Sequence, residues 1–404
     1  MSNLGLKLKS MCQKKLKIGL IGFGVVGEGI YQILKNTPTL DAEIIKIGIK
    51  HPNKLRNAPK NLFTDNIDSI LENESINVIV ELIDDDKAAF DIIKKALSLG
   101  KAVVSANKKM IAKHQKELID LQHKYKVPLL YEAAVGGSLP IIRNLEEYYD
   151  NDMLQSFEGI INGSTNYILD AIQEKNLTFG DALKIAQDLG FAESNPQLDV
   201  SGEDSVNKLG IILNHAFGIV IDTQKILRLG ITNINKADIA FAKEHNYKIK
   251  LIAKAKIQDN QSITAFVLPT FIDSKEMFYN INHENNGIAL GSSFSENQFF
   301  SGKGAGRFPT ASAVLSDISA LRYDYKYEYR KYNSNLNTTF SNDEEIKIYV
   351  SFNDWEDIET QSFMKIDKIF ESKNYKYIIG DILAKKINTE KWMVNKNNSV
   401  IAFK

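Results

Sequence analysis

Acidic residues and a lysine gather in one short segment, GFAESNPQLDVSGEDSVNK, at residues 190–208. Glu193 and Asp199 stand in its first part, and Asp204 begins an apolar run with helical spacing. Asp204 and Lys208 are four residues apart, so they share one helix face. Such acids can hold a substrate ammonium group, and a lysine beside them can move a proton. The same residues also fit a capped helix that carries a surface ion pair.

A second lysine, Lys108, follows an apolar run at 101–105 within the sequence SANKK. Ligands of an open α/β sheet bind beyond the carboxyl ends of its strands. We therefore expect Ser105 and Lys108 at the cofactor edge of such a sheet. Lys108 and Lys109 are adjacent, and one of two adjacent lysines is usually just a surface residue. Lys108 is a candidate active-site residue because of its position after the strand, not because it is a lysine.

A glycine-rich turn lies directly between a predicted strand and a predicted helix, which is the context that a dinucleotide-binding turn requires. Its glycines permit a tight turn, a close approach of pyrophosphate and close helix–strand packing, and the helix N-terminus favours the anion. The predicted cofactor-binding residues are Gly22, Phe23, Gly24, Val25, Val26 and Gly27. An ordinary glycine turn in an unrelated α/β protein is the alternative.

The end of the second predicted strand bears on the choice of cofactor. NAD-preferring sites often place an acid there, whereas this chain has Lys50 and His51, with Arg56 soon after. Basic residues accept the 2′-phosphate of NADP, so the sequence favours NADP over NAD. Alternatively, Lys50 is merely a solvated strand end.

Strand-like and helix-like segments alternate over about the first 135 residues. The predicted strands cover 16–21, 43–50, 77–83, 101–105 and 127–131. The predicted helices cover 29–34, 67–71, 90–99 and 113–124, and Gly100 ends the third. This alternation predicts an α/β fold with a doubly wound parallel Rossmann sheet.

The pattern changes after about residue 150 and predicts an α+β domain. Its predicted helices cover 165–174, 178–189 and 203–217, and its strands 247–257 and 262–269. A second glycine-rich turn followed by a helix lies within 299–318. After a polar gap, residues 344–404 have the pattern strand, helix, strand, strand, which predicts a small third domain.

The composition limits the function classes. Fifty basic and fifty acidic residues among 404 give zero formal net charge, which argues against a nucleic-acid-coating protein. The single cysteine, Cys12, excludes an intramolecular disulfide and a cysteine-rich zinc site. The sequence has no signal peptide and no membrane-spanning run, so we expect a cytoplasmic protein without nucleic-acid or membrane partners.

Six segments, in this order, resemble homoserine dehydrogenases. They are 18–27, 105–112, 131–140 (YEAAVGGSLP), 162–169 (NGSTNYIL), 190–208 and 302–314 (GKGAGRFPTASAV). The resemblance implies NAD(P)H-dependent reduction of L-aspartate 4-semialdehyde to L-homoserine, on the route to threonine, methionine and isoleucine. In that chemistry a hydride reaches the aldehyde carbon and a lysine ammonium protonates the oxygen. A neighbouring lysine lowers the pKa of that ammonium.

The resemblance also implies roles for single residues. It makes Lys208 the acid/base residue and Lys108 the second active-site lysine. The substrate-binding residues that it implies are Glu193, Asp199, Asp204, Gly163 and Ser164. Gly306 matches a second cofactor-contacting turn. A loop for a monovalent cation, Na⁺ or K⁺, is matched by Glu132, Val135, Gly137 and Leu139, largely through backbone carbonyls. A glycine-rich connector between domains is the alternative for that loop.

The predicted domains follow from these segments. Residues 1–15 are a flexible tail, and 16–140 form the NAD(P)-binding domain, to which the helix at 305–320 returns. Residues 141–333 form the catalytic and dimerisation domain, and 344–404 resemble the regulatory ACT domain of many relatives. The resemblance implies a homodimer or homotetramer, and the short segment before Lys17 predicts a monofunctional enzyme.

Two places depart from the family pattern. Phe191 stands where a tyrosine is common, so a hydroxyl is lost, and three consecutive acids, Asp84, Asp85 and Asp86, replace the usual glycines. These acids repel phosphate unless they face solvent. Aspartate semialdehyde dehydrogenase is an alternative that needs a catalytic thiolate, for which only Cys12 is present. Another Rossmann oxidoreductase of amino acids or sugars, and a non-catalytic nucleotide-sensing protein, are further alternatives.

Overall fold

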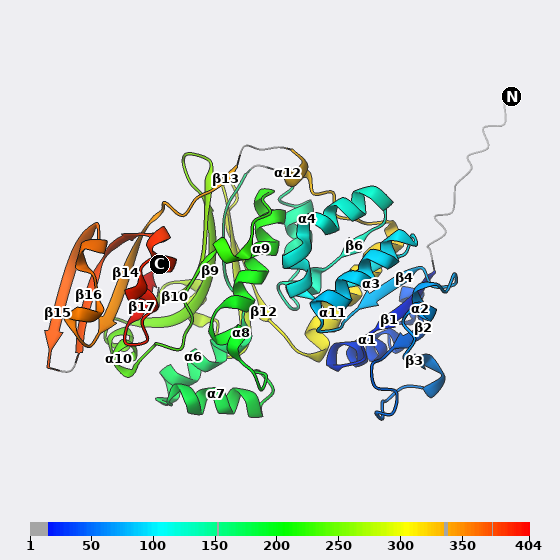
Figure 1. Ribbon diagram of the computed structural model, residues 1–404, viewed down its shortest axis with the longest axis horizontal. Helices are drawn as coiled ribbons and strands as arrows, with labels where there is room; N and C mark the ends of the chain where they lie inside the picture. The colour runs from blue at the N-terminus through cyan, green and yellow to red at the C-terminus, as the bar shows by residue number, and fades with distance from the viewer. Residues whose placement is uncertain (1–14, 152, 335–337, 374) are drawn as a thin grey trace. The chain divides into compact units, whose positions relative to one another are not determined.

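The computed structural model describes residues 15–151, 153–334, 338–373 and 375–404 (Figure 1). The chain forms two compact units. The first comprises the described residues up to Asn107 together with Glu117–Tyr131 and Ala311–Tyr327. The second comprises Lys108–Lys116, Glu132–Thr310 and Glu328–Lys404. The tail predicted over 1–15 lies outside the described residues except for Lys15, and so does Cys12.

The first unit is built on a six-stranded sheet whose paired strands are all parallel. Its strand order, β3-β2-β1-β4-β5-β6, is that of a dinucleotide-binding fold. The strands are β1 (Leu16–Ile21), β2 (Ala42–Gly48), β3 (Phe63–Thr64), β4 (Val78–Glu81), β5 (Ala102–Ser105) and β6 (Leu129–Leu130). The predicted Rossmann sheet is therefore confirmed. Only β3, two residues long, was absent from the prediction.

The first unit also contains the helices α1 (Val25–Lys35), α2 (Asp68–Leu71) and α3 (Asp86–Ser98), together with the C-terminal parts of α4 (Lys108–Tyr125) and α11 (Arg307–Ala320). Three of them, α1, α3 and α4, begin earlier than predicted. Asp85 caps α3 by accepting a hydrogen bond from the Ala88 amide at 2.9 Å. Helix α4 begins at Lys108 and is kinked at His114. Lys108 is therefore a first-turn helix residue.

The second unit is built on an eleven-stranded mixed sheet with the order β12-β11-β7-β9-β10-β17-β14-β16-β15, to which β8 and β13 add on β10. Its first strands are β7 (Leu154–Ile160), β8 (Leu227–Arg228), β9 (Tyr247–Ile257), β10 (Ser262–Asp273), β11 (Asn285–Ser292) and β12 (Glu296–Lys303). Its last are β13 (Thr339–Phe340), β14 (Glu345–Phe352), β15 (Lys365–Ser372), β16 (Tyr375–Leu383) and β17 (Ser399–Phe403).

The helices of this unit are α5 (Ile141–Glu147), α6 (Gly163–Lys175), α7 (Phe179–Asp188), α8 (Gln197–Val200), α9 (Glu203–Phe217), α10 (Lys236–Glu244) and α12 (Arg330–Asn333). Helix α9 has the predicted bounds because glycines with positive φ stand at both ends, Gly202 (+81°) and Gly218 (+70°). It packs on β7, β9 and β10, and most of its residues are buried.

The helix predicted inside residues 344–404 is wrong. Between β14 and β15 the chain forms only the 3₁₀ turns Trp355–Asp357 and Thr360–Ser362, and it buries Ile358 against the sheet. Short segments seldom hold a helix without a continuous buried face. Strand β17 pairs with β10, so these C-terminal strands continue the sheet of the second unit.

Candidate active site

One buried carboxylate holds two lysines in the second unit. The Lys108 Nζ lies 2.6 Å from Asp204 Oδ1, and the Lys208 Nζ lies 2.8 Å from Asp204 Oδ2. Asp204 is 4% exposed, whereas the Lys108 side chain is 44% exposed. The predicted proximity of the two lysines is thus present in the fold, with Asp204 as their common counter-ion.

In this arrangement the pKa values of the two lysines shift in opposite directions. The Asp204 charge raises the pKa of Lys108, whereas burial lowers the pKa of Lys208, assisted by the nearby Lys108 charge. Burial alone would raise the pKa of Asp204, but the two ammonium groups hold that pKa well below its usual range. Lys208 is therefore the lysine that gives up its proton more readily.

Asn162 joins the acids of this cluster. Its side-chain amide donates to Asp199 Oδ1 at 2.7 Å and to Asp204 Oδ2 at 2.8 Å. Its carbonyl oxygen accepts from the Thr165 amide at 2.8 Å and so caps α6. Burial and the Asp204 charge raise the pKa of Asp199. The sequence reasoning missed Asn162, although an Asn three residues before Thr165 at a helix start was a usable signal.

Backbone geometry fixes Lys208 in place. Its Nζ donates to the Ile161 carbonyl at 2.7 Å, directly after β7. Gly202, with positive φ, turns the chain from α8 into α9, so that Asp204 and Lys208 face inward one turn apart. The ammonium of Lys208 therefore has one carboxylate and one carbonyl partner among the contacts described.

The remaining predicted substrate residues surround the cluster less closely. Glu193 is exposed and acts on Lys108 through its charge. Gly163 begins α6 where an added Cβ would come within 2.5 Å of the Glu284 carbonyl. The Ser164 hydroxyl donates to the Phe191 carbonyl at 2.5 Å, so it holds the loop that leads to Glu193.

The first glycine turn has the shape of a phosphate cradle. Gly22 has φ +101°, and an added Cβ would meet the Leu82 carbonyl at 2.6 Å. A Cβ at Gly27 would overlap the Gly22 carbonyl, so this glycine lets α1 pack on the turn. Gly24 has a φ of −86°, which suits any residue, and an added Cβ there would meet nothing within 4 Å. The space beside Gly24 is therefore open. That open space at a helix N-terminus fits a dinucleotide pyrophosphate.

The other predicted residues of this turn differ in surroundings. The Phe23 ring packs edge-on against Phe63 at 5.2 Å between centroids. Val25 is exposed and Val26 is half-buried. Lys50 is exposed after β2, and Arg56 lies over the Phe63 ring. Basic side chains therefore stand near the strand end where sequence analysis expects the ribose.

A hydrogen-bonded network joins the ends of β4 and β5. The Ser105 hydroxyl donates to Glu81 Oε2 at 2.6 Å and accepts from the Asn107 amide at 3.1 Å. The Glu81 Oε1 accepts from the Ile83 amide at 2.7 Å, and burial raises the Glu81 pKa to about 7. Two of the acids that follow Ile83 stabilise the start of α3, because Asp85 is its N-cap and Asp86 lies in its first turn.

The proposed cation loop is buried. Glu132, Val135, Gly137 and Leu139 all lie inside the second unit. The Glu132 carboxylate accepts from the Ile142 and Arg143 amides, each at 2.9 Å, and burial raises its pKa. Gly137 has φ +66° and lies against the Gly304 carbonyl. The Glu132 and Leu139 carbonyls accept backbone hydrogen bonds from the Val135 and Ile141 amides at 3.4 and 3.0 Å.

Three further observations bear on the predicted residues and partner classes. Gly306 has φ +125° in the turn before α11, a conformation that favours glycine. Among the residues that the structure describes, no three His, Cys, Asp or Glu side chains are grouped as a metal site. None of the helices in the described ranges is long and apolar enough to cross a membrane.

Comparisons with known proteins agree with this geometry. A family model described as homoserine dehydrogenase matches residues 140–319, and one described as homoserine dehydrogenase, NAD binding domain, matches residues 22–132. A homoserine dehydrogenase of Helicobacter pylori is 38% identical over 314 residues, covering 76% of this chain and 73% of its own. That of Synechocystis is 35% identical over 313 residues, covering 75% and 72%.

A solved structure extends the likeness to the whole fold. The crystal structure of a homoserine dehydrogenase from Thiobacillus denitrificans superposes with a TM-score of 0.86 at 27% identity, covering 97% of this chain and 98% of its own. The predicted oxidoreductase function is confirmed, whereas the roles of single residues stay predictions. With a nicotinamide-dinucleotide domain, a two-lysine cluster and relatives of this similarity, the chain belongs to the homoserine dehydrogenase family.

Proposed function

We propose that this enzyme, an oxidoreductase acting on CH–OH groups, interconverts L-aspartate 4-semialdehyde and L-homoserine at the cluster of Lys108, Asp204 and Lys208. The single observation that carries the proposal is the buried Asp204 carboxylate shared by two ammonium groups. Lys208 is the proton donor to the carbonyl oxygen during reduction, because burial lowers its pKa. Lys108 keeps its proton, since Asp204 raises its pKa, and it stabilises negative charge on the same oxygen.

The acids around the lysines supply the amino-acid specificity. Asp199 and Glu193 carry negative charge beside the cluster and are proposed to bind the substrate ammonium group. Asp204 holds both lysines in place, and Asn162 orients Asp199 and Asp204. The α6 N-terminus, with Gly163 and Ser164, is proposed to face the substrate carboxylate, because free amides favour an anion.

A reduced nicotinamide dinucleotide, when bound, supplies the hydride. The residues proposed to hold it are Gly22, Phe23, Gly24, Val25, Val26, Gly27, Lys50, Ser105, Lys108 and Gly306. We propose NADP rather than NAD, because Lys50 and Arg56 follow β2 where an acid would favour NAD.

Several broader expectations belong to the same proposal. A Na⁺ or K⁺ ion is proposed to bind the carbonyls of the loop with Glu132, Val135, Gly137 and Leu139, where its role is to fix the turn beside Gly304. We also propose a homodimer or homotetramer located in the cytoplasm. The predicted domains, 16–140, 141–333 and an ACT-like 344–404, remain part of this proposal.

The test is a spectrophotometric assay of NADPH oxidation with L-aspartate 4-semialdehyde. Lys208→Ala is expected to lower kcat by ~10²–10⁴-fold, the usual value of general acid catalysis. Lys109→Ala removes an adjacent, exposed lysine and serves as the matched control. Turnover of Lys208→Ala within a few-fold of the parent would remove Lys208 from the mechanism.

A further inference from the structure

A fully buried lysine on β9 lies outside the residues proposed for the active site. The Lys250 Nζ lies 2.5 Å from Asp170 Oδ1 on α6, and the two side chains are 0% and 2% exposed. The same Nζ donates to Asn166 Oδ1 at 3.0 Å and to the Ile281 carbonyl at 2.7 Å. Each of the three ammonium protons therefore has an acceptor, and the ammonium group joins β9 to α6 and to the segment between β10 and β11.

Residues 281–285 form a turn that is bound to the same two α6 side chains. Asp170 Oδ2 accepts a hydrogen bond from the His283 amide. Asn166 Nδ2 donates to three carbonyls of the turn, those of Ile281, His283 and Asn285, at 3.0, 2.8 and 3.3 Å. His283 has φ +59°, a conformation that is uncommon outside glycine, so the turn depends on these side-chain bonds for its shape.

The 281–285 turn lies directly against the start of α6. An added Cβ at Gly163, the first residue of α6, would come within 2.5 Å of the Glu284 carbonyl. Gly163 and Ser164 are the residues proposed above to face the substrate carboxylate. The buried lysine that binds the turn is therefore connected, through one backbone contact, to the helix N-terminus at which the substrate is proposed to bind.

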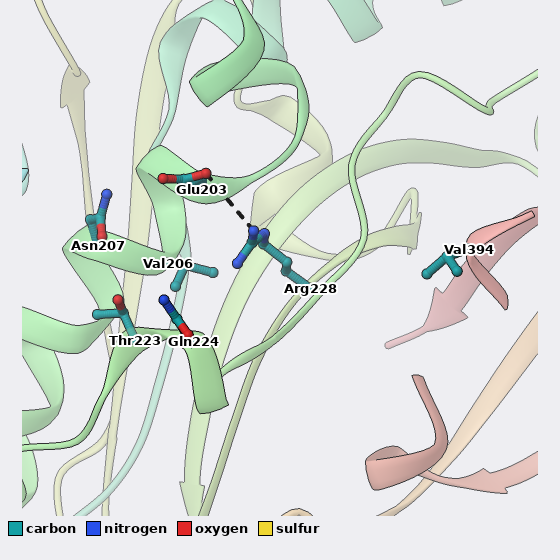
Figure 2. A pocket seen from close by; sticks show the side chains of 7 residues that line it. All are labelled: Glu203, Val206, Asn207, Thr223, Gln224, Arg228 and Val394. Carbon is teal, nitrogen blue, oxygen red and sulfur yellow. Dashed lines mark ion pairs between the residues drawn. The ribbon is translucent and has the colours of Figure 1, made fainter. Parts of the chain in front are cut away.

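Stability alone does not account for this buried pair of charges. Burial lowers the pKa of Lys250, because removing an ammonium group from water costs free energy. A buried ion pair therefore often stabilises a fold no more than two apolar side chains of similar volume do. An exposed pair such as Glu203 and Arg228, 3.8 Å apart with side chains 40% and 33% exposed, also contributes little, because water screens it (Figure 2). The buried pair differs from both because its bonds fix the positions of β9, α6 and the turn relative to one another.

We propose that Lys250 is a positioning residue, which holds the 281–285 turn against Gly163 and thereby fixes the α6 N-terminus for the substrate carboxylate. This inference rests on the proposed substrate site at Gly163 and Ser164. Without the ammonium group the turn loses its bond to β9, and the first turn of α6 loses the backbone that packs against it. The amides of α6 are then no longer aimed at the carboxylate, so the substrate binds more weakly. The two lysines at Asp204 are unchanged, so bound substrate reacts at the parent rate.

The test is steady-state kinetics of the double variant Lys250→Met/Asp170→Asn with L-aspartate 4-semialdehyde and NADPH. Both charges are removed together, because Lys250→Met alone leaves a buried carboxylate without its cation, which strongly destabilises a fold. The KM for the aldehyde is expected to rise by ~10-fold or more, which is typical of one lost hydrogen bond to a charged group. The kcat and the KM for NADPH should stay within a few-fold of the parent. Lys256→Met, at an exposed position of the same strand, is the matched control and should change none of these values.

Amide hydrogen exchange of the ligand-free double variant supplies a readout that does not depend on activity. Exchange in residues 163–166 and 281–285 is expected to be faster than in the parent, whereas exchange in β16 and the urea unfolding midpoint stay close to the parent values. Unchanged exchange in both segments, an unchanged KM for the aldehyde, an equal rise in both KM values, or loss of the folded state would each overturn the proposal. A parent enzyme that does not turn over L-aspartate 4-semialdehyde would instead refute the proposed function, so the two failures are distinguishable.

Discussion

The ammonium groups of Lys108 and Lys208 bind different oxygens of one buried carboxylate, at 2.6 and 2.8 Å. The Asp204 charge, shared by both ammonium groups, allows the two cations to lie close together. Their pKa values nevertheless shift in opposite directions. The pKa of Lys108 is raised by that charge, and the pKa of Lys208 is lowered by burial. When the surroundings separate the pKa values of two neighbouring groups, one group keeps its charge and the other can carry a proton. Here Lys108 keeps its charge and Lys208 can carry the proton.

Asp204→Asn should shift the pH dependence of homoserine oxidation. The Asp204 charge raises the pKa of Lys208 against the effect of burial, so its removal lowers that pKa further. Oxidation needs the neutral amine as base, and the acid limb of the kcat profile should therefore move to lower pH. Turnover should also fall, since Lys108 loses its partner. Glu203→Gln, which removes the adjacent carboxylate, is the control, and an unmoved acid limb in Asp204→Asn would contradict the assignment.

Asn162→Ser should separate the catalytic role of Asn162 from its role in the helix. Serine is also a good N-cap, so α6 should lose little stability, and urea unfolding should give a free energy close to that of the parent. The amide bonds to Asp199 and Asp204 disappear, however. Hydrogen bonds to charged groups contribute ~1.5–3 kcal/mol, so kcat/KM should fall by ~10–100-fold. Normal kcat/KM would show that the acids orient themselves without Asn162.

The sequence predicts the parts of this molecule that depend on local signals. The bounds of α9 and β9 agree residue for residue with the prediction, because α9 has a glycine at each end and β9 is a long, strand-forming run. The turn at Gly22 is only partly local, since a Cβ at Gly27 would meet the Gly22 carbonyl, whereas a Cβ at Gly22 would meet the Leu82 carbonyl after β4. Position and spacing make Lys108 and Lys208 candidates, since Lys108 follows a predicted strand and Lys208 is four residues after Asp204, and the family resemblance implies their roles.

Other features depend on distant partners. Asn162 bonds to acids 37 and 42 positions away, which no local pattern contains. The segment after β14 has helix-like spacing, yet its Ile358 packs into a core with Phe266 and Trp392 that only the folded sheet creates. The sequence alone predicts that the acids after Ile83 repel a phosphate unless they face solvent, whereas in the fold Asp85 is the N-cap of α3.

Glu81→Gln should change how stability varies with pH. The carboxyl is fully buried and its pKa is raised from 4.5 to about 7, so the folded state keeps a proton that the unfolded state releases. Stability is therefore lost as pH rises from about 4.5 to 7, by ~3 kcal/mol in total. Relative to the parent, Glu81→Gln should gain stability over this range in urea unfolding at pH 5 and pH 8. The exposed Glu43→Gln is the control, and a pH-independent difference for Glu81→Gln would refute the buried titration.

Lys50→Glu should turn the cofactor preference toward NADH. A carboxylate there can hold a ribose 2′-hydroxyl and repels a 2′-phosphate. The ratio of kcat/KM with NADPH to that with NADH is expected to fall at least tenfold. Lys35→Glu makes the same charge change at the last residue of α1, the end remote from the glycine turn, and should leave the ratio alone. A parent enzyme that already prefers NADH strongly would defeat the NADP proposal before any substitution is made.

A monovalent cation in the loop at Gly137 should be visible in thermal unfolding. An ion that binds only the folded state stabilises it, so the Tm in KCl or NaCl should exceed that in tetramethylammonium chloride at equal ionic strength. Gly137→Ala should abolish this difference, because a Cβ at φ +66° would collide with the Gly304 carbonyl and distort the loop. Gly100→Ala has a similar strained φ of +73° but meets nothing within 4 Å, so it should lower the Tm while keeping the salt difference. If Gly137→Ala retains the full difference, the ion binds elsewhere or only nonspecifically.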